Sequence, residues 1–166
     1  MADLRDVATD LVGILKAAVP ALEAVGEDAS LRTRGEGSWS RKQVLGHLVD
    51  SALNNLHRFV RAQQAGALAF PGYEQESWVA LGGYQDRPWH SIVSLWAELN
   101  AQAAHVIARI PAERLATPCH IGDGEPVTLE FVARDYVRHL RHHLEQILEP
   151  EGSRGKQHRS FAEPGP

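Results

Sequence analysis

Apolar residues recur at steps of three and four along four separate stretches of this chain, which is the period of an α-helix. One face of the first stretch carries Leu4, Val7, Leu11, Ile14, Leu15 and Ala18. The pattern weakens at Pro20 and Gly26. Because an amphipathic helix has to bury its apolar face against another element, four of them predict an all-α fold, a four-helix bundle.

Capping residues predict where the other three helices begin. Ser40 followed by Gln43 has the spacing of a capping box, so the second helix begins at about Arg41. Thr128 can cap the fourth helix in the same way. The second, third and fourth helices are predicted over 41 to 63–66, 88–110 and 129–148.

A long connection, 67–87, separates the second and third helices. Glycine and proline are too frequent in it for one long helix, and it is rich in aromatic residues such as Tyr73 and Trp78. A long loop of this kind is a candidate lid or binding loop. We see no strict alternation of apolar and polar residues, the pattern of a half-buried strand, anywhere in the chain.

The length of 166 residues and an apolar share of 43% fit one domain with a sizeable core. We predict a bundle domain over 1–149. The remaining stretch, 150–166, lacks apolar periodicity and is predicted to be a disordered tail.

Charge and composition exclude several classes of partner. A net charge of -4 leaves no basic surplus for a phosphate backbone, so nucleic acid is not an expected partner. No apolar run approaches the roughly 20 residues that a membrane helix needs. The N-terminal stretch has no secretion signal, and the single Cys119 cannot form an internal disulfide, which together predict a cytoplasmic protein.

Nine histidines are the unusual feature of the composition. In the fourth predicted helix, His139 and His143 lie one turn and about 40° apart, so their imidazoles can converge on one ion. His142 points to the far side. A pair of hydrogen-bonded boundary histidines would show the same spacing, so the pair alone is a weak signal. His90 and His105 have no partner at ligand spacing, His57 is expected to be solvated rather than to orient a ligand, and His158 belongs to the tail. Cys119 and His120 are adjacent in a loop, so they are not expected to face each other as a nucleophile and its base.

His47 in the second helix is the candidate third ligand. It shares one side of that helix with the polar residues Asp50, Ser51, Asn54, Arg58 and Arg61, opposite the apolar side. Two interpretations are open. Periodicity alone favours a solvated face, whereas a functional site requires that this polar face line a cleft beneath the aromatic loop.

Three segments of the sequence resemble the DinB-like, YfiT-like family of metal-dependent proteins assigned as hydrolases. These segments are SWSRKQVLGHLVDSALNNLHRFVRAQ, PGYEQESWVALGGYQDRPW and LEFVARDYVRHLRHHLEQI. The most specific feature is a histidine early in helix two followed by H-x-x-x-H late in helix four, here His47, His139 and His143.

The resemblance implies a four-helix bundle, commonly a homodimer, in which these three histidines bind nickel, zinc or another divalent ion. Related members use low-molecular-weight thiols such as bacillithiol, mycothiol or glutathione in transfer or isomerisation reactions. No motif in this sequence identifies a particular thiol or electrophile.

Three neutral imidazoles would leave an open position on the ion, which is typical of a catalytic site. We therefore predict an enzyme that carries out thiol-dependent transfer or hydrolysis on a small molecule, with a metal-bound water or thiol as nucleophile and none from the protein. The residues expected to orient a ligand or contact the substrate are Asp135, one turn before His139, and Asn54, Arg58, Tyr73 and Trp78. The alternatives are a non-catalytic metal-binding or stress-response module and a purely structural helical protein.

Overall fold

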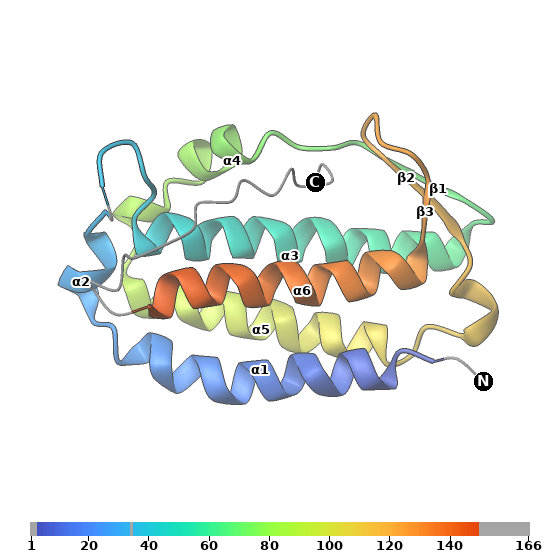
Figure 1. Ribbon diagram of the computed structural model, residues 1–166, viewed down its shortest axis with the longest axis horizontal. Helices are drawn as coiled ribbons and strands as arrows, with labels where there is room; N and C mark the ends of the chain where they lie inside the picture. The colour runs from blue at the N-terminus through green and yellow to red at the C-terminus, as the bar shows by residue number, and fades with distance from the viewer. Residues whose placement is uncertain (1–2, 34, 150–166) are drawn as a thin grey trace.

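Four long helices lie side by side (Figure 1), and most of the buried apolar residues that form the core belong to them. The computed structural model of this protein describes residues 3–33 and 35–149. Its long helices are α1 (Arg5–Glu23), α3 (Arg41–Gln64), α5 (Trp89–Ile107) and α6 (Leu129–Leu148). The predicted four-helix bundle is confirmed, while the tail predicted over 150–166 lies outside the described residues.

Side-chain caps fix the starts of two of these helices. The Ser40 hydroxyl accepts a hydrogen bond from the Gln43 backbone, and the Gln43 side chain accepts one from the Ser40 backbone. The Thr128 hydroxyl accepts from the backbone of Phe131. Each cap satisfies backbone N–H groups that the first helical turn leaves unpaired, so α3 and α6 begin where the sequence predicts.

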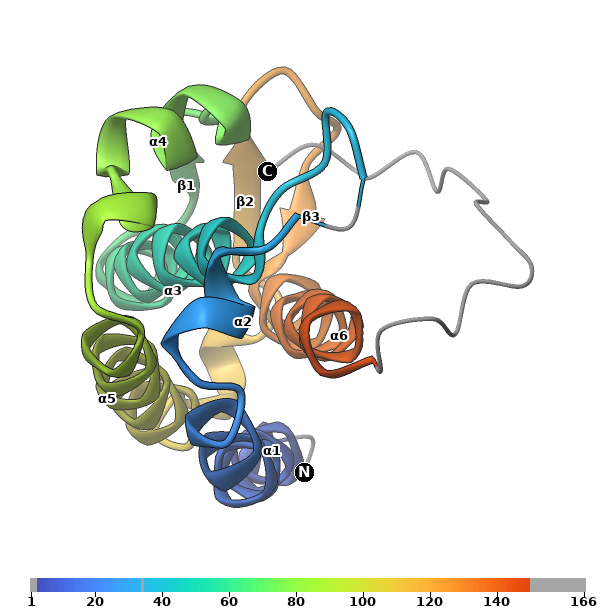
Figure 2. The same cartoon turned by 90° about the vertical axis from the view of Figure 1, so that its left-hand side faces the viewer.

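The helices pack in pairs around the core, with α1 against α5 and α6, and α3 against the same two helices (Figure 2). In Figure 1, α3 and α5 run in one direction and α1 and α6 in the other. The chain therefore crosses back along the bundle between the end of α3 and the start of α5. Among the described helices, none is long and apolar enough to cross a membrane.

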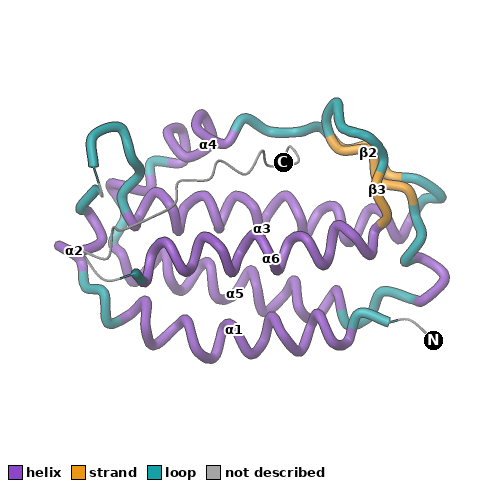
Figure 3. The backbone as a smooth tube through the Cα atoms, in the orientation of Figure 1, coloured by secondary structure: helices purple, strands orange, loops and turns teal. Residues whose placement is uncertain are grey.

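The connection that makes this crossover is not the plain loop that the sequence predicts. It contains strand β1, helix α4 and a short 3-10 helix η1, each of which contacts α3, and Figure 3 shows α4 above that helix. The shorter elements of the chain are α2 (Glu27–Leu31), β1 (Leu68–Phe70), α4 (Gln75–Gly82), η1 (Tyr84–Asp86), η2 (Ala112–Arg114), β2 (Pro118–Ile121) and β3 (Val127–Thr128). A strand of two to four residues is too short to show the period of two, so the sequence gives no signal for it.

The three strands form one small sheet in the order β1, β2, β3. β1 pairs with β2 in parallel, with Leu68 opposite Cys119, and β2 pairs with β3 antiparallel, with Pro118 opposite Thr128. β3 leads directly into α6. The sheet thus ties the end of α3 to the start of α6, which are the two helices that carry the predicted ligands.

The polar side of α3 is buried, so its interpretation as a solvated face is wrong for most of its length. His47, Asp50, Asn54 and Arg58 are each less than one-tenth exposed, and of the residues named for this face Arg61 is exposed. The cause is tertiary. α6 packs beside this helix while α4, η1 and β1 contact it, so that apolar and polar sides are both enclosed.

Candidate metal centre

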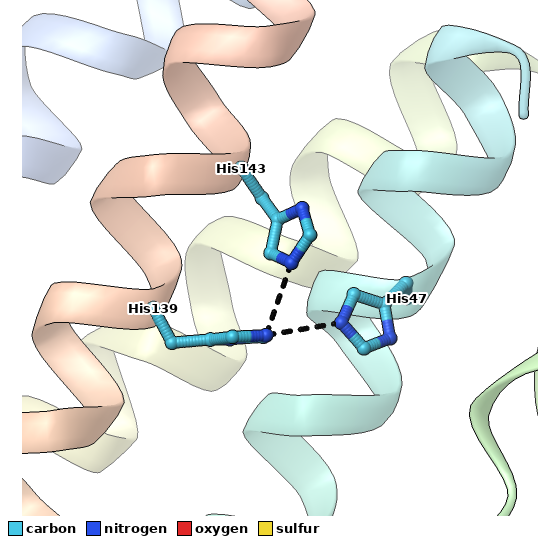
Figure 4. A group of neighbouring side chains, drawn as sticks. All are labelled: His47, His139 and His143. Atoms are coloured by element: carbon cyan, nitrogen blue, oxygen red, sulfur yellow. Dashed lines mark hydrogen bonds between the residues drawn. The ribbon is translucent and has the colours of Figure 1, made fainter. Parts of the chain in front are cut away.

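Three imidazole rings meet between α3 and α6, one from the first helix and two from the second (Figure 4). His139 Nε2 lies 3.2 Å from His47 Nε2 and 3.0 Å from His143 Nε2. The two rings on α6 are neighbours because they lie four residues apart, which is one helical turn. The structure thus brings together the three histidines that the sequence singles out.

These separations fit a shared metal ion better than a closed hydrogen-bond network. Around a tetrahedral ion with metal–nitrogen bonds of about 2.0–2.1 Å, neighbouring nitrogens lie roughly 3.3 Å apart, and around an octahedral ion roughly 2.9 Å. All three candidate ligand atoms lie within 4.8 Å of one another. An Nε2 atom is either a donor or an acceptor, never both, so three facing atoms cannot all pair with one another.

Burial keeps two of the three imidazoles neutral. It lowers the pKa of His47 from 6.5 to about 4 and that of His139 from 6.5 to about 3, with a further lowering from the charge of His143. A neutral imidazole has a free lone pair for a metal ion, whereas a protonated one has none. The site is therefore ready to bind a cation near neutral pH.

Gln146 orients the third imidazole. Its amide oxygen Oε1 lies 2.9 Å from His143 Nδ1 and can only accept, so Nδ1 is the donor and Nε2 keeps its lone pair. The amide nitrogen of Gln146 lies 3.1 Å from His142 Nε2 and donates to it. His142 is exposed and does not join the cluster, but it holds the amide of Gln146, which in turn orients His143. Gln146 is not among the site residues predicted from the sequence, although its i+3 position from His143 is a usable signal.

Trp39 and Asp50 are two further residues of the site that were not predicted from the sequence. Trp39 lies against the His47 ring, and Asp50 lies one turn along the same helix. Trp39 packs on the His47 ring with centroids 5.5 Å apart. Asp50 is 3% exposed; its Oδ1 accepts a hydrogen bond of 2.6 Å from the Tyr84 hydroxyl, and its Oδ2 has no partner among the described residues. Burial raises the pKa of Asp50 from 3.8 to about 6.

Two glycines explain how Tyr84 reaches Asp50. A Cβ atom at Gly46 would overlap the Tyr84 ring, and one at Gly82 would lie 2.6 Å from its Cε2 atom. The ring therefore packs directly on backbone on both sides. This close approach depends on residues far apart in the chain, so local periodicity could not reveal it.

The structure places the other predicted contact residues in three settings. Asn54 and Arg58 are buried on the His47 side of α3. The Asp135 carboxylate accepts a 3.0 Å hydrogen bond from Arg138 Nε and a second hydrogen bond from Arg138 Nη2. Within the described structure, Arg138 is thus the partner of this carboxylate. Tyr73 and Trp78 pack together with ring centroids 5.0 Å apart on the crossover, where Trp78 remains 40% exposed. Their roles toward a substrate stay predictions.

Cys119 does not form a nucleophile pair with the adjacent His120. The Cys119 thiol is fully buried, donates to the Thr117 carbonyl at 3.6 Å, and has its pKa raised by burial. His120 lies on the opposite side of β2 and is exposed. Successive residues of a strand face opposite ways, which separates the two.

The family comparison agrees with the geometry. The family model of the DinB superfamily matches residues 11–147, so the chain belongs to the DinB superfamily. This match includes α3 and α5 in full, α6 except its last residue, α1 from Leu11 onward, and all three clustered histidines.

Three curated relatives carry the name "Putative metal-dependent hydrolase". One from Halalkalibacterium halodurans is 27% identical over 70% of this chain and 67% of its own length. YfiT of Bacillus subtilis is 26% identical over 69% and 65%, and a relative from Oceanobacillus iheyensis is 26% identical over 76% and 72%. The alignments thus span about two thirds of these relatives.

The solved structure of YfiT from Bacillus subtilis has the same fold. It superimposes with a TM-score of 0.73 at 23% identity, covering 86% of this chain and 83% of that one. It is described as a probable metal-dependent hydrolase with an unusual four-helix bundle topology. The parallel course of α3 and α5 makes the topology of the present bundle depart from a simple up-and-down arrangement as well.

Proposed function

We propose that this protein is a metal-dependent hydrolase of a small molecule, with one divalent ion held by His47, His139 and His143. The observation that carries the proposal is the convergence of three imidazoles, in which the Nε2 atom of His139 lies 3.2 Å from that of His47 and 3.0 Å from that of His143, two spacings that match the edges of a coordination shell. The relatives named as metal-dependent hydrolases support the same reaction class. When bound, such an ion supplies a Lewis acid and activates a water molecule near neutral pH.

The residues of the chain prepare this site in two ways. Trp39 and the packed helices exclude bulk water from the His47 imidazole, which strengthens its interaction with a cation. Gln146 holds His143 in the tautomer that points a lone pair at the ion. Zinc and nickel both accept imidazole ligands, so the donor set fits the metals expected from the sequence.

Asp50 is the residue that we assign to proton transfer. Its unpaired Oδ2 can take up a proton, and a pKa of about 6 lies close to the pH at which a general base works best. Tyr84 holds the other oxygen and so fixes the orientation of the carboxylate. Asp50 lies one turn after His47 on the same side of α3, which places it beside the proposed centre.

Metal analysis of untagged protein tests the site. The wild-type protein is expected to bind about one nickel or zinc ion per chain, and alanine at His47, His139 or His143 to weaken binding by at least about 100-fold. His57→Ala is the matched control, since His57 is an exposed histidine on the same helix as His47. Equal metal affinity in His139→Ala and His57→Ala would refute the three-histidine centre.

Activity assays separate hydrolysis from the thiol-dependent transfer that the family resemblance also suggests. Metal-loaded protein is incubated with nitrophenyl esters alone, and with chloronitrobenzene plus bacillithiol, mycothiol, glutathione or coenzyme A. Hydrolysis predicts metal-dependent turnover of an ester without thiol, lost in His139→Ala and reduced about 10²–10⁴-fold in Asp50→Asn. Turnover that requires a thiol would replace the hydrolase assignment by a transferase.

A further inference from the structure

Arg58 on α3 is a buried charge that the described residues leave unneutralised. Its side chain is only 4% exposed. One of its nitrogens, Nη1, donates a long hydrogen bond of 3.4 Å to Asn55 Oδ1. The other two, Nε and Nη2, are buried and have no hydrogen-bond partner among the described residues.

The groups around Arg58 do not balance its charge. The guanidinium Cζ atom lies 5.2 Å from the centroid of the Phe70 ring, which belongs to β1. Burial lowers the pKa of Arg58, and the neighbours that oppose this effect are the Tyr73 phenol and the Cys119 thiol, neither of which is a carboxylate. A buried arginine normally pairs with an anion, because an unpaired charge in the interior is costly.

The two unpaired nitrogens lie on the same edge of the planar guanidinium. Nε–H and one Nη2–H point in parallel from that edge, at the spacing that matches the two oxygens of a carboxylate. Phe70, whose ring lies beside the guanidinium, and Tyr73 are both half-buried, so two side chains that neighbour Arg58 are partly open to solvent. We propose that the Nε and Nη2 edge of Arg58 is a binding site for the carboxylate of a small organic acid.

This site and the proposed metal centre share one side of α3. Eleven residues separate His47 from Arg58, which corresponds to three turns, a rotation of about 20° and a rise of about 16 Å along the helix. The inference rests on the proposed function for the identity of the ligand: the substrate is an elongated acid, with its carboxylate on Arg58 and its reacting bond at the histidines. The carboxylate site itself stands on the geometry of Arg58 alone.

Binding of hexanoate, followed by NMR of the arginine Nε–H groups, tests the site directly. The Arg58 Nε–H signal is expected to move downfield on titration, and 1-hexanol, which has the same chain without the charge, to leave it unchanged. Arg58→Gln should weaken hexanoate binding by at least about tenfold. Arg61→Gln is the matched control, because Arg61 is exposed and its Cζ lies 5.9 Å from the same Phe70 ring.

Equal hexanoate affinity in Arg58→Gln and wild type would overturn the proposal, and so would tighter binding of hexyl phosphate than of hexanoate. Arg58→Met provides a test without ligand, since it removes an uncompensated charge at similar volume. Its melting temperature is expected to be at least that of the wild type, and a value several degrees lower would mean that the guanidinium is satisfied inside the protein.

The metal-site variant His139→Ala separates this proposal from the hydrolase assignment. Hexanoate binding that survives in His139→Ala supports a carboxylate site that does not need the metal. If the metal-loaded protein shows no hydrolysis while Arg58 still binds hexanoate, the proposed function fails and the carboxylate site stands. If metal-dependent hydrolysis is found but hexanoate binds Arg58→Gln as tightly as wild type, the hydrolase function stands and the carboxylate site at Arg58 is refuted.

Discussion

Two buried cations on α3 show how differently one helix can treat a charge. Near the start of the helix, Lys42 is 2% exposed; its ammonium group pairs with the Glu27 carboxylate and donates to the Arg87 carbonyl at 2.6 Å. Further along, Arg58 is 4% exposed, and two of its nitrogens have no hydrogen-bond partner among residues 3–33 and 35–149. The two side chains are buried to a similar degree, but they differ in how many of their N–H groups find a hydrogen-bond partner among the described residues. We infer that burial of a charge does not by itself indicate a ligand site, whereas a buried charge without a partner does.

Replacement of Lys42 by methionine should give the largest effect. The change leaves the Arg87 carbonyl without its donor and removes the partner of Glu27, which stays half exposed and hydrated. We expect a loss of about 3 kcal/mol in the free energy of unfolding, measured by urea denaturation. The control is Lys16→Met, an exposed lysine on α1, with no more than a few tenths expected. If Arg58→Met lost as much free energy of unfolding as Lys42→Met, the contrast between a paired and an unpaired buried cation would be wrong.

Asp50 extends the comparison to an acid, because it too has an unpaired buried oxygen. Its folded-state pKa of about 6 lies above the unfolded value of 3.8, so the native protein holds a proton that the unfolded chain has already lost. Its contribution to stability is therefore present below about pH 4 and is lost as the pH rises to about 6. For metal-free protein, the wild type should lose roughly 1–3 kcal/mol relative to Asp50→Asn across this range.

His47 and His139, whose pKa values are lowered, act in the opposite direction and must be held constant in that experiment. Their folded-state pKa values of about 4 and about 3 lie below the unfolded value of 6.5. Their contribution is lost as the pH falls from 6.5 toward these values. Because wild type and Asp50→Asn share both histidines, the difference between the two proteins isolates Asp50. A difference independent of pH would contradict the raised pKa.

The Tyr136 and Asn100 pair should give the smallest effect of the three. The Tyr136 hydroxyl donates to Asn100 Oδ1 at 2.5 Å, and the Asn100 amide donates to the Trp96 carbonyl at 2.8 Å. Tyr136→Phe leaves one buried neutral acceptor unpaired, so we expect a loss of about 1–2 kcal/mol in thermal or urea unfolding. An effect equal to that of Lys42→Met would mean that charge adds nothing to the cost of an unpaired group.

The sequence predicts the long helices well because their ends are decided locally. The capping residues Ser40 and Thr128 act within one helical turn, and α3 and α6 begin directly after them. The small sheet escapes prediction for the opposite reason. β1 pairs with β2 about 50 residues away, and neither strand is long enough to carry a pattern of its own.

The candidate site is only partly readable from the sequence. The spacing of His139 and His143 places two ligands on one face of one helix, so helical geometry suffices to pair them. His47 required the family resemblance, because periodicity assigned its side of α3 to solvent. What buries that side is the crossover and α6, and a single-helix pattern contains no information about either.

His47 and His139 lie 92 residues apart in the chain. An ion held by both can bind only after α3 has docked on α6, so it would cross-link an early and a late part of the polypeptide. Ion binding and docking then stabilise each other by the same free energy. Metal release during unfolding can be followed by the absorbance of a coloured ion or by a fluorescent chelator. It would report when these two helices separate, independently of the loss of helix measured by circular dichroism.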